Sequence, residues 1–365
     1  MPKTKLIIVG GFLGAGKTTL LWETAKLFMG KGLKVGLITN DQAPELVDSA
    51  ILKLSGLSVA EVSGSCFCCN FNGFTNAIKQ LQGQAAPDVI IAEPVGSCAD
   101  LSATIIQPLK KFFAAELELA PFTVLADPNR LPSILEGGNG GLHPDAAYIF
   151  GKQLEEGDIL LLTKVDALPA ADKEALLKKL VDAHPQATVM AVSAVTGEGM
   201  DAWMEQVTTR QDAGKMLLHI DYDRYAHGEA VLGWLNGTIK LLSAEPTDWN
   251  ILVQSFVTQL AKSFEAESLP VGHVKVIVEN GTQFAVSNLT QDSQTITLRG
   301  DAGKGTEAML VINARVETTP EHLDELVRAV LNTMLGGHFE QTELAWKFLQ
   351  PGRPNPTHRF VEIVK

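Results

Sequence analysis

The sequence predicts an α/β fold with a mainly parallel sheet, followed by a smaller α+β domain. Two observations support this for the first 206 of the 365 residues. Short apolar runs alternate with segments of helical periodicity, and several of the runs are apolar on both faces. Buried parallel strands have this character, and the alternation is typical of a parallel sheet covered by helices.

Each element of this first part is expected from its own stretch of sequence. Apolar runs bounded by polar or glycine-containing turns predict strands at residues 6–9, 35–39, 59–62, 89–92, 121–126, 158–163 and 188–192. The stretches between them predict helices at residues 18–29, 72–82, 97–113, 171–184 and 200–206. Because the alternation ends there, we expect the first domain at residues 1–206.

The rest of the chain predicts a linker, a second domain and a tail. Residues 207–228 carry scattered charges with little periodicity, which indicates a linker. In a second domain at residues 229–335 we expect strands at 231–242, 271–279, 282–288, 294–299 and 309–317 and helices at 249–265 and 320–335. Asn280-Gly281 favours a tight hairpin, and Pro320 suits a helix start. Residues 336–365 are expected to form an irregular or docked C-terminal tail.

The loop after the first predicted strand carries a phosphate-binding pattern. It reads Gly11-Phe12-Leu13-Gly14-Ala15-Gly16-Lys17-Thr18 and fits G-x-x-x-x-G-K-[ST], the P-loop. Its glycines let backbone N–H groups face phosphate oxygens, and the helix that follows adds partial positive charge. Lys17 can reach the β- and γ-phosphates, and Thr18 can give its hydroxyl to Mg²⁺. The pattern predicts a P-loop NTPase whose nucleotide lies against Gly11, Gly14, Ala15, Gly16, Lys17, Thr18 and Thr19.

A second motif, Thr163-Lys164-Val165-Asp166, indicates which base is bound. It fits [NT]KxD and ends an apolar strand, where open α/β sheets bind ligands. The Asp166 carboxylate can accept hydrogen bonds from guanine N1–H and N2–H₂, a donor pair that adenine lacks. The Lys164 stem can lie over the base, and the Ser193-Ala194 loop can offer a backbone N–H to guanine O6. Alone, the motif also fits an exposed strand end; downstream of a P-loop it favours GTP.

Two acidic residues are candidates for holding Mg²⁺ and for positioning the attacking water. Glu93 and Asp41 each follow a predicted strand. Carboxylates at strand ends near a P-loop can do either task, so Lys17, Glu93 and Asp41 are the catalytic candidates. The sequence does not divide the two roles, and a simple strand-end turn is the alternative. Gly96 lets the backbone approach the γ-phosphate and change conformation when it leaves.

Three of the four cysteines stand together in Cys66-Phe67-Cys68-Cys69, in a loop before a predicted helix. Three thiols this close can face one soft cation, and thiolates favour Zn²⁺, Cu⁺ and similar ions. A nearby helix N-terminus favours the thiolate form. Cysteines also serve as small buried hydrophobes, an explanation that suits isolated cysteines better than this cluster. We therefore expect a metal site at Cys66, Cys68 and Cys69.

Four motifs follow one another in the chain: the GFLGAGKTTLL loop, the CxCC cluster, the ExxG strand end and the [NT]KxD motif. In this order they resemble the CobW-type GTPases, which are metallochaperone-like relatives of HypB and UreG. The resemblance covers the first domain throughout and the second domain only in its order of elements. It implies metal binding at Cys66, Cys68 and Cys69 that is coupled to GTP hydrolysis. It also implies delivery of the metal to a client metalloenzyme or cofactor pathway.

The chain departs from that family's pattern in several places. Ser65 stands where Gly is usual, and Asn40-Asp41-Gln42 stands where members commonly carry Asn-Glu. The chain has no His-rich stretch, which argues against bulk metal storage, and its eight histidines are dispersed, so none is assigned as a ligand. Cys98 is not a usual family ligand. It is either a fourth thiolate or core filling, and we favour core filling.

Composition limits the partners and the compartment. A net charge of −12 without an evident basic face argues against nucleic acid as a main partner. No run of eighteen apolar residues exists, so no membrane span is expected. The N-terminal apolar segment lacks a small-residue cleavage site and leads into the P-loop, unlike a signal peptide. The clustered cysteines do not resemble a disulfide framework, so we expect a cytoplasmic protein.

Together these features predict a GTP-binding and GTP-hydrolysing metallochaperone. Its cofactors would be GTP, Mg²⁺ and Zn²⁺ or Co²⁺, and its partner a client metalloprotein or a cofactor-pathway enzyme. The alternatives are a P-loop small-molecule kinase with structural cysteines and a GTPase switch that acts on a protein partner without metal delivery. The [NT]KxD motif weighs against the kinase. The sequence leaves open the client, the physiological metal and the oligomeric state, a homodimer included.

Overall fold

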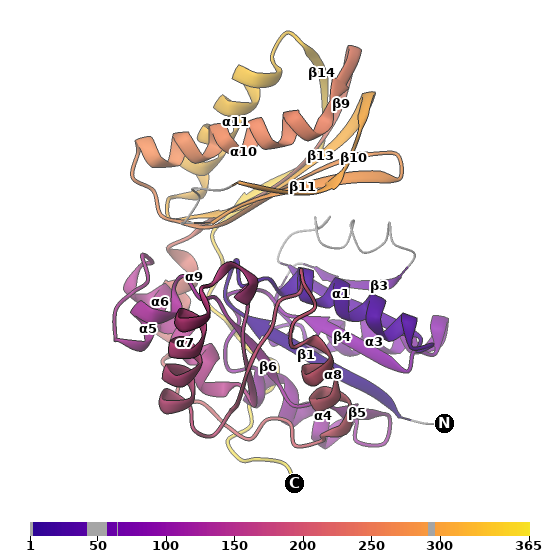
Figure 1. The fold of residues 1–365 in the computed structure, drawn as a ribbon, viewed down its shortest axis with the longest axis vertical. Coiled ribbons are helices and arrows are strands. Elements are labelled where there is room, and N and C mark those ends of the chain that lie inside the picture. Colours follow the sequence, from indigo (N-terminus) through magenta and orange to yellow (C-terminus); the bar gives the residue numbers. More distant parts are fainter. Residues whose placement is uncertain (1–2, 42–56, 64, 291–295) are drawn as a thin grey trace.

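The computed structural model describes residues 3–41, 57–63, 65–290 and 296–365. This part of the chain forms two units, each built on its own sheet and lying one above the other (Figure 1). The first unit has a parallel sheet with helices on both faces. The second has an antiparallel sheet whose helices lie on the face turned away from the first unit. The predicted fold class, an α/β unit followed by a smaller α+β unit, is confirmed.

The sheet of the first unit has the order β3-β2-β4-β1-β6-β7-β8, with β5 beside β1 and every pair parallel. Its strands are β1 (Thr4–Gly11), β2 (Val35–Asp41), β3 (Ser58–Ser63), β4 (Val89–Glu93), β5 (Leu117–Leu119), β6 (Thr123–Ala126), β7 (Ile159–Leu162) and β8 (Thr188–Ala191). Each strand expected in this part overlaps one of these, and the short β5 is an addition. The carboxyl ends of β1, β4 and β7 therefore meet at one edge, where parallel sheets bind ligands.

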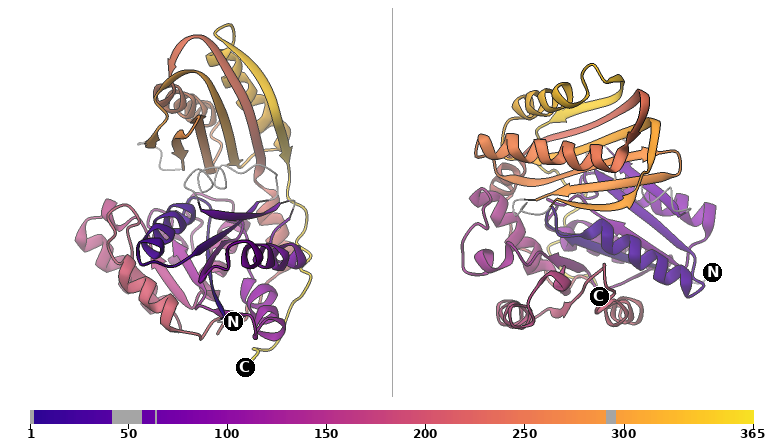
Figure 2. Two further views of the ribbon diagram at one scale, coloured as in Figure 1. Left: turned by 90° about the vertical axis from the view of Figure 1, so that its right-hand side faces the viewer. Right: turned by 45° about the horizontal axis from the view of Figure 1, so that its top comes forward.

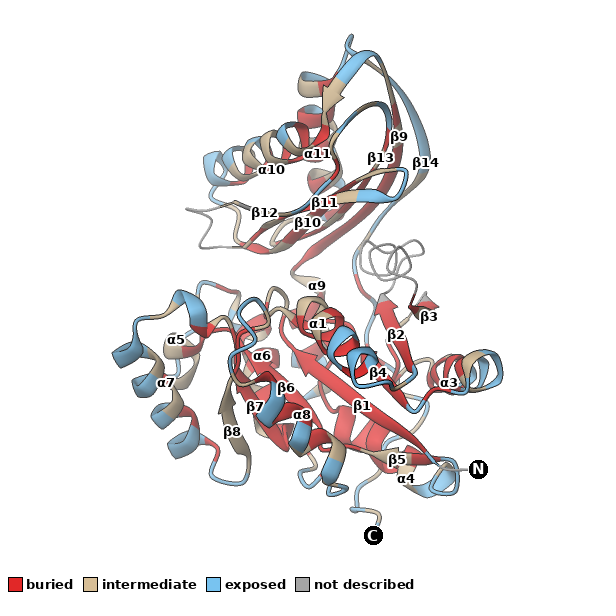
Figure 3. Cartoon of the chain, turned by 45° about the vertical axis from the view of Figure 1, so that its right-hand side comes forward, coloured by how far each residue is buried: buried red, intermediate tan, exposed pale blue. Residues whose placement is uncertain are grey.

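Helices cover both faces of this sheet, and a hydrophobic core lies under each set (Figure 3). They are α1 (Lys17–Gly30), α3 (Phe71–Ala85), α4 (Gln107–Phe112), α5 (Leu131–Leu135), α6 (Pro144–Glu156), α7 (Ala170–Ala183), α8 (Met200–Thr209) and α9 (Tyr222–Ala230). Side chains of α1 and α8 form one core, and those of α3, α4 and α6 belong to the other. No helix in the described ranges combines the length and apolar character that crossing a bilayer requires.

The second unit is a six-stranded antiparallel sheet with the order β12-β11-β10-β13-β9-β14. Its elements are β9 (Gly233–Asp248), α10 (Trp249–Ala266), β10 (Val271–Asn280), β11 (Gln283–Leu289), β12 (Thr297–Asp301), β13 (Lys304–Val316), α11 (Pro320–Leu335) and β14 (Phe339–Leu349). The turn between β10 and β11 lies at Asn280-Gly281, and Gly281 has a positive φ of 63°. The first residues of the strand expected at 294–299 lie outside the described residues.

The structure differs from the expectations in several places. Helices α5 and α6 lie where no element was expected, and the helix expected at 97–113 begins only at residue 101, with a π-helical turn at Ser102–Ile106 before α4. Helix α9 lies within the expected linker, and strand β14 within the expected tail. Helix α9 is short and polar, so packing stabilises it rather than its own periodicity. Strand β14 is mostly exposed and pairs with β9 through its backbone, so it lacks an alternating apolar pattern.

The second sheet packs on the P-loop side of the first unit. Ile277, Val286 and Val311 belong to the same core as α1, and the ring centroids of Trp22 and Phe284 are 6.1 Å apart. The boundaries between domain, linker and tail at residues 206, 228 and 335 stay predictions.

A buried carboxylate is among the contacts that hold the segment between α8 and α9 against the first unit. Asp158, at the start of β7, is almost fully buried and accepts backbone hydrogen bonds from Phe122 (2.7 Å), Gly214 (2.6 Å) and Lys215 (2.9 Å). Asp158 therefore connects β6, β7 and the chain that leads to α9.

We expect Asp158→Ala to lower the free energy of unfolding by about 2–4 kcal/mol, because three backbone N–H groups lose their acceptor. Urea denaturation followed by circular dichroism measures the change. Asp182→Ala is the matched control, since Asp182 makes only an exposed ion pair with Lys178 on α7. Equal losses in the two variants would contradict this role of Asp158.

Candidate nucleotide and thiol sites

The P-loop connects β1 to α1 at the carboxyl edge of the parallel sheet. Gly11, Gly14 and Gly16 have φ values of 132°, 80° and 95°, which residues with a Cβ rarely adopt. The Lys17 ammonium is buried and donates to the carbonyl oxygens of Gly11 (2.8 Å) and Phe12 (3.2 Å). The loop therefore folds around the ammonium that was predicted to contact the phosphates.

Glu93 and Gly96 lie against this loop, because β4 is the direct neighbour of β1. The Thr18 hydroxyl donates to Glu93 Oε2 at 3.1 Å, which places two oxygen ligands together of the kind that Mg²⁺ prefers. A Cβ on Gly96 would lie 3.1 Å from Lys17 Nζ and 2.8 Å from Leu13 Cδ2, so a larger residue would displace the ends of these side chains. Strand β2 ends at Asp41, whose side chain lies outside the described residues.

The [NT]KxD segment follows β7 at the same edge. The Thr163 hydroxyl donates to Ala15 O at 3.0 Å and so connects the motif to the P-loop. Lys164 has a positive φ of 56°, and its ammonium donates to Asp127 Oδ2 at 2.7 Å. Asp166 is exposed in the short turn that follows. Asp127, which was not identified from the sequence, follows β6. Placing it beside Lys164 would have required knowing that β6 and β7 are neighbours in the sheet.

The Ser193-Ala194 loop follows β8, the strand beside β7. Ser193 is buried, and its hydroxyl accepts hydrogen bonds from the backbone of Val195 and Thr196. Because the Ser193 N–H already donates to Glu198 O at 2.9 Å, a backbone donor toward the base could come from Ala194.

The second unit adds two cations at the start of α1 that sequence reasoning missed. Lys275 on β10 donates to the Thr18 hydroxyl at 3.4 Å, and Arg299 on β12 donates to the Thr19 hydroxyl at 3.1 Å. A Cβ on Gly14 would lie 2.9 Å from Thr290 Cγ2, which shows how closely the second unit approaches the loop. These contacts join residues more than 250 positions apart, so no local pattern indicates them.

Cys66, Cys68 and Cys69, here called the thiol cluster, have sulfur atoms within 4.8 Å of one another. The Sγ–Sγ distance is 2.9 Å for Cys66 and Cys68 and 3.8 Å for Cys68 and Cys69. Hydrogen bonds from the neighbouring thiols, Cys68 first, lower the pKa of Cys66 well below its ordinary value. The same contact raises the pKa of Cys68. The cluster therefore favours one thiolate that is surrounded by thiol donors.

Asn40, at the end of β2, holds the loop of the thiol cluster. Its Oδ1 accepts from Phe67 N at 2.8 Å, and its Nδ2 donates to Val62 O at 2.8 Å and Ser65 O at 2.9 Å. Phe67 stacks on Phe74 of α3 with centroids 4.2 Å apart. Because Asn40 precedes Asp41, the strand end that carries a candidate for holding Mg²⁺ or positioning water also holds the thiol loop.

Cys98 lies beside the thiol cluster. Its thiol is buried, and interaction with Cys66, followed by burial, raises its pKa well above the ordinary value. Helix α9 closes this region: the Ser97 hydroxyl donates to Glu229 at 2.5 Å, and Ala99 N donates to the Tyr225 hydroxyl at 3.1 Å. Burial raises the pKa of Glu229 to about 8. Cys98 is thus part of the buried core that also contains Cys66 and Cys68.

Residues 350–365, here called the C-terminal segment, run from the second sheet along the first unit and over the thiol loop (Figure 2). Thr357 N donates to Cys68 O at 2.8 Å, and Asn355 N donates to Cys69 Sγ at 3.2 Å. Arg359 forms an ion pair with the buried Asp100 at 2.7 Å. A docked tail was one of the two expectations for this proline-containing stretch, but its contact with the cysteines was not expected.

The P-loop, its helix and the aligned strand ends define a P-loop nucleotide-binding protein. Residues 5–191 match the family model of the CobW/HypB/UreG nucleotide-binding domain, and the chain belongs to this family of P-loop GTPases. The predicted family is thereby confirmed.

Relatives match over part of their length. The hydrogenase maturation factor HypB of Azotobacter chroococcum mcd 1 is 28% identical over 212 residues, which are 57% of this chain and 60% of HypB. The zinc chaperone YeiR of Escherichia coli K12 is 28% identical over 184 residues, which are 48% of this chain and 50% of YeiR. The chain thus spans about half the length of these curated relatives. Among solved structures, the Zn(II)-bound YjiA GTPase of E. coli aligns with 92% of this chain and with 99% of its own length, at 16% sequence identity. The TM-score is 0.36, so this likeness supports no functional conclusion.

Proposed function

We propose that the chain is a GTP-hydrolysing metallochaperone. It would bind GTP with Mg²⁺ at the P-loop, hold one Zn²⁺ or Co²⁺ ion on the thiol cluster, and deliver that ion to a client metalloenzyme or a cofactor-pathway enzyme. One observation carries the proposal: residues 93–98 lead from Glu93 at the Thr18 hydroxyl to Cys98, which lies in the same buried core as Cys66 and Cys68. Relatives named as a zinc chaperone and as a hydrogenase maturation factor support it.

On the nucleotide side, the proposal assigns the phosphates to the P-loop. Lys17 would exchange the Gly11 and Phe12 carbonyls for phosphate oxygens, which are stronger acceptors for an ammonium. Thr18 and Glu93 offer the oxygen ligands that fit Mg²⁺, which neutralises phosphate charge when bound. Glu93 or Asp41 would orient the attacking water.

On the thiol side, the observed spacing suits a tetrahedral ion. Zn–S bonds of about 2.3 Å place neighbouring sulfurs roughly 3.8 Å apart. Cys68 and Cys69 are at 3.8 Å, and Cys66 needs to move away from Cys68 by less than about 1 Å from its present 2.9 Å. Cys98, which the sequence favoured as core filling, lies outside the group of sulfur atoms within 4.8 Å of one another, so the fourth ligand is left to water or to the client.

The proposal requires nucleotide and metal to change each other's affinity. GTP would order residues 93–98 and the end of β2, and both segments contact the thiol loop through Cys98 and Asn40. A ligand that favours one arrangement of these segments then alters the affinity of the other site. Transfer of Zn²⁺ to a fluorescent chelator, measured with GTP and with GDP, tests the function; equal transfer rates would contradict it.

The choice of base tests the GTP assignment separately. Asp166→Asn replaces an acceptor oxygen with a donor that faces the guanine donors, so GTP affinity should fall by about 2–4 kcal/mol. Xanthosine triphosphate, which carries an acceptor at that edge, should bind better to the variant. Fluorescent-nucleotide competition measures both, with Asp172→Asn on exposed α7 as the control. Equal ATP and GTP affinities in the unmodified protein would refute guanine recognition and favour the kinase alternative.

A further inference from the structure

Two histidines and an aspartate meet at the surface of the first unit, where α6 packs against α9. His143 caps the N-terminus of α6, Asp145 lies in its first turn, and His227 lies on α9. Asp145 and His227 are 82 positions apart in sequence. One ligand atom from each of the three lies within 4.8 Å of the others. We call these residues the histidine cluster. Besides the thiol cluster, no other such group is found in the part of the chain that the structure describes.

From this arrangement we infer that the histidine cluster is a second binding site for a divalent transition-metal ion, separate from the thiol cluster. Asp145 Oδ2 lies 2.7 Å from His227 Nδ1 and 3.9 Å from His143 Nδ1. Ligand bonds of 2.0–2.2 Å around tetrahedral zinc place neighbouring ligand atoms roughly 3.3–3.5 Å apart. The two observed distances lie on either side of that range, and His143 Nδ1, which accepts from Asp145 N at 3.2 Å, would exchange that hydrogen bond for the ion.

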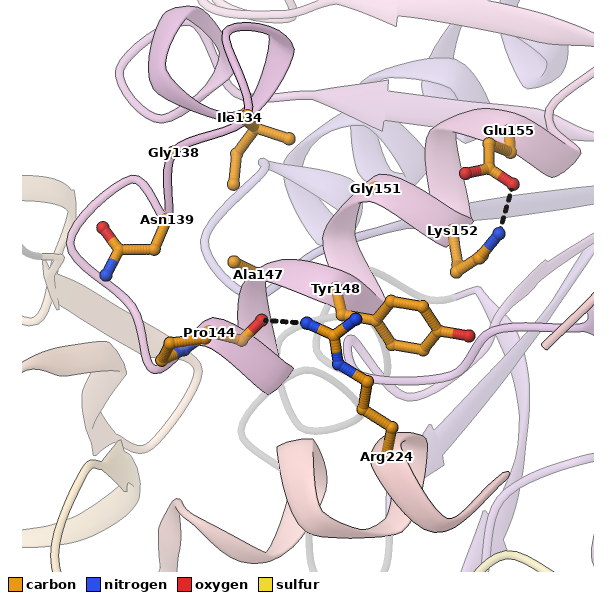
Figure 4. Close-up of a pocket in the computed structure, with 11 residues that line it drawn as sticks. Ile134, Gly138, Asn139, Pro144, Ala147, Tyr148, Gly151, Lys152, Glu155 and Arg224 are labelled. Carbon is orange, nitrogen blue, oxygen red and sulfur yellow. Dashed lines mark hydrogen bonds and ion pairs between the residues drawn. The ribbon is translucent and has the colours of Figure 1, made fainter. Parts of the chain in front are cut away.

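The surrounding structure fixes the positions of these side chains. Helices α6 and α9 touch through their backbones, because a Cβ on Gly228 would lie 2.3 Å from Asp145 O. Arg224 donates from Nε to Asp145 Oδ1 at 2.6 Å and stacks over the Tyr148 ring at 4.4 Å (Figure 4). Oδ1 is thus engaged while Oδ2 faces the imidazoles. Hydrogen bonds of this kind orient the ligating carboxylates of metal sites.

The donor set and its exposure define the class of ion. Two imidazoles and one carboxylate suit Zn²⁺, Ni²⁺, Co²⁺ or Cu²⁺ and leave one coordination position for water or a ligand from another molecule. The His227 side chain is 59% exposed, so this position is accessible to solvent. Glu317, which follows β13, accepts from His143 N at 3.1 Å and adds negative charge that offsets Arg224.

Helix α9 lies between this site and the thiol cluster. Tyr225 and Glu229 on one face of α9 bond to the loop of Cys98, while Arg224 and His227 face α6. The molecule therefore has a buried sulfur-rich site and an exposed nitrogen-rich site on two faces of one nine-residue helix. An exposed site with an open position can take up or release an ion faster than a closed thiolate site. Metal binding here does not depend on the proposed function.

Cobalt titration of the full chain tests the inference, because Co²⁺ reports its ligands by absorption. In a Cys66→Ser, Cys68→Ser, Cys69→Ser variant we expect one equivalent of Co²⁺ to remain bound, without the near-ultraviolet band of thiolate-to-cobalt charge transfer. Adding His143→Ala and His227→Ala should remove that equivalent. Adding His219→Ala and His338→Ala, two exposed histidines outside any cluster, should leave it in place.

The same histidine substitutions in the otherwise unmodified chain separate the two sites. There we expect the Co²⁺ stoichiometry to fall from two to one while the charge-transfer band stays. Retention of the second equivalent in the His143→Ala, His227→Ala variant would overturn the inference, and so would no Co²⁺ binding by the triple serine variant. Loss of the charge-transfer band from the unmodified chain would instead count against the proposed thiol site. Circular dichroism melting curves confirm that each variant is folded.

Discussion

Replacing Lys17 with alanine is expected to abolish GTP hydrolysis and to weaken GTP binding strongly. The Lys17 ammonium is buried at the centre of the P-loop, within 2.8–3.2 Å of two carbonyl oxygens that phosphate oxygens would replace. A positioned cation that stabilises developing charge on transferring phosphates contributes at least about 100-fold to the rate. Single-turnover hydrolysis and GTP titration of Lys17→Ala measure the two losses.

Lys26→Ala is the control for this variant. Lys26 lies on the same helix, α1, but its side chain is exposed and pairs with Glu23. Hydrolysis and GTP affinity should be unchanged in Lys26→Ala, and both variants should melt as folded proteins. Unaltered turnover in Lys17→Ala would mean that the P-loop assignment is wrong.

Replacing Cys66, Cys68 and Cys69 together by serine is expected to remove the thiol-bound ion and to leave GTP binding intact. The unmodified cluster should bind about one Zn²⁺ or Co²⁺ per chain, release protons on binding, and bind more tightly as pH rises through the thiol range. GTP affinity is the internal control for folding, since the described P-loop contacts of Lys17 and Thr18 do not involve these cysteines. A triple variant that still shows the charge-transfer band of thiolate-bound cobalt would contradict the site.

Nucleotide dependence of this metal affinity is the sharper result. By linkage, GTP and metal must change each other's affinity by the same factor. Titrating Zn²⁺ in the presence of GDP and then of a non-hydrolysable GTP analogue measures the factor. Identical Zn²⁺ affinities in the two nucleotide states would mean that the metal site is not coupled to the nucleotide. The alternative of a GTPase switch that acts on a protein partner without metal delivery would then be favoured.

The sequence was sufficient to predict the parts of the molecule that are local. The P-loop, the [NT]KxD motif and the CxCC cluster each lie within a few residues, and the α/β class follows from strands that are apolar on both faces. The strand ends could be placed at one edge because parallel strands align their carboxyl ends. Thus Glu93 could be expected beside Thr18 before their 3.1 Å contact was known.

What the sequence did not predict depends on contacts between distant residues. Lys275 and Arg299 reach the P-loop from the second unit, and Thr357 reaches the thiol loop from the C-terminal segment. Dispersed histidines were assigned no role, yet the packing of α9 on α6 brings His143 and His227 together. The local sequence around each histidine does not indicate this pairing, because helix α9 itself depends on tertiary contacts.

Lys275 and Arg299 make the start of α1 a point of contact between the two units. Around Thr18 and Thr19, the described contacts bring together Lys17 and Glu93 of the first unit and Lys275 and Arg299 of the second unit. A nucleotide bound at this loop would bring its negative charge to a place that both units share, and a triphosphate carries about one negative charge more than a diphosphate. Loss of the γ-phosphate would therefore change the electrostatic attraction between the loop and the second sheet. Salt would reduce this difference, since the attraction is electrostatic.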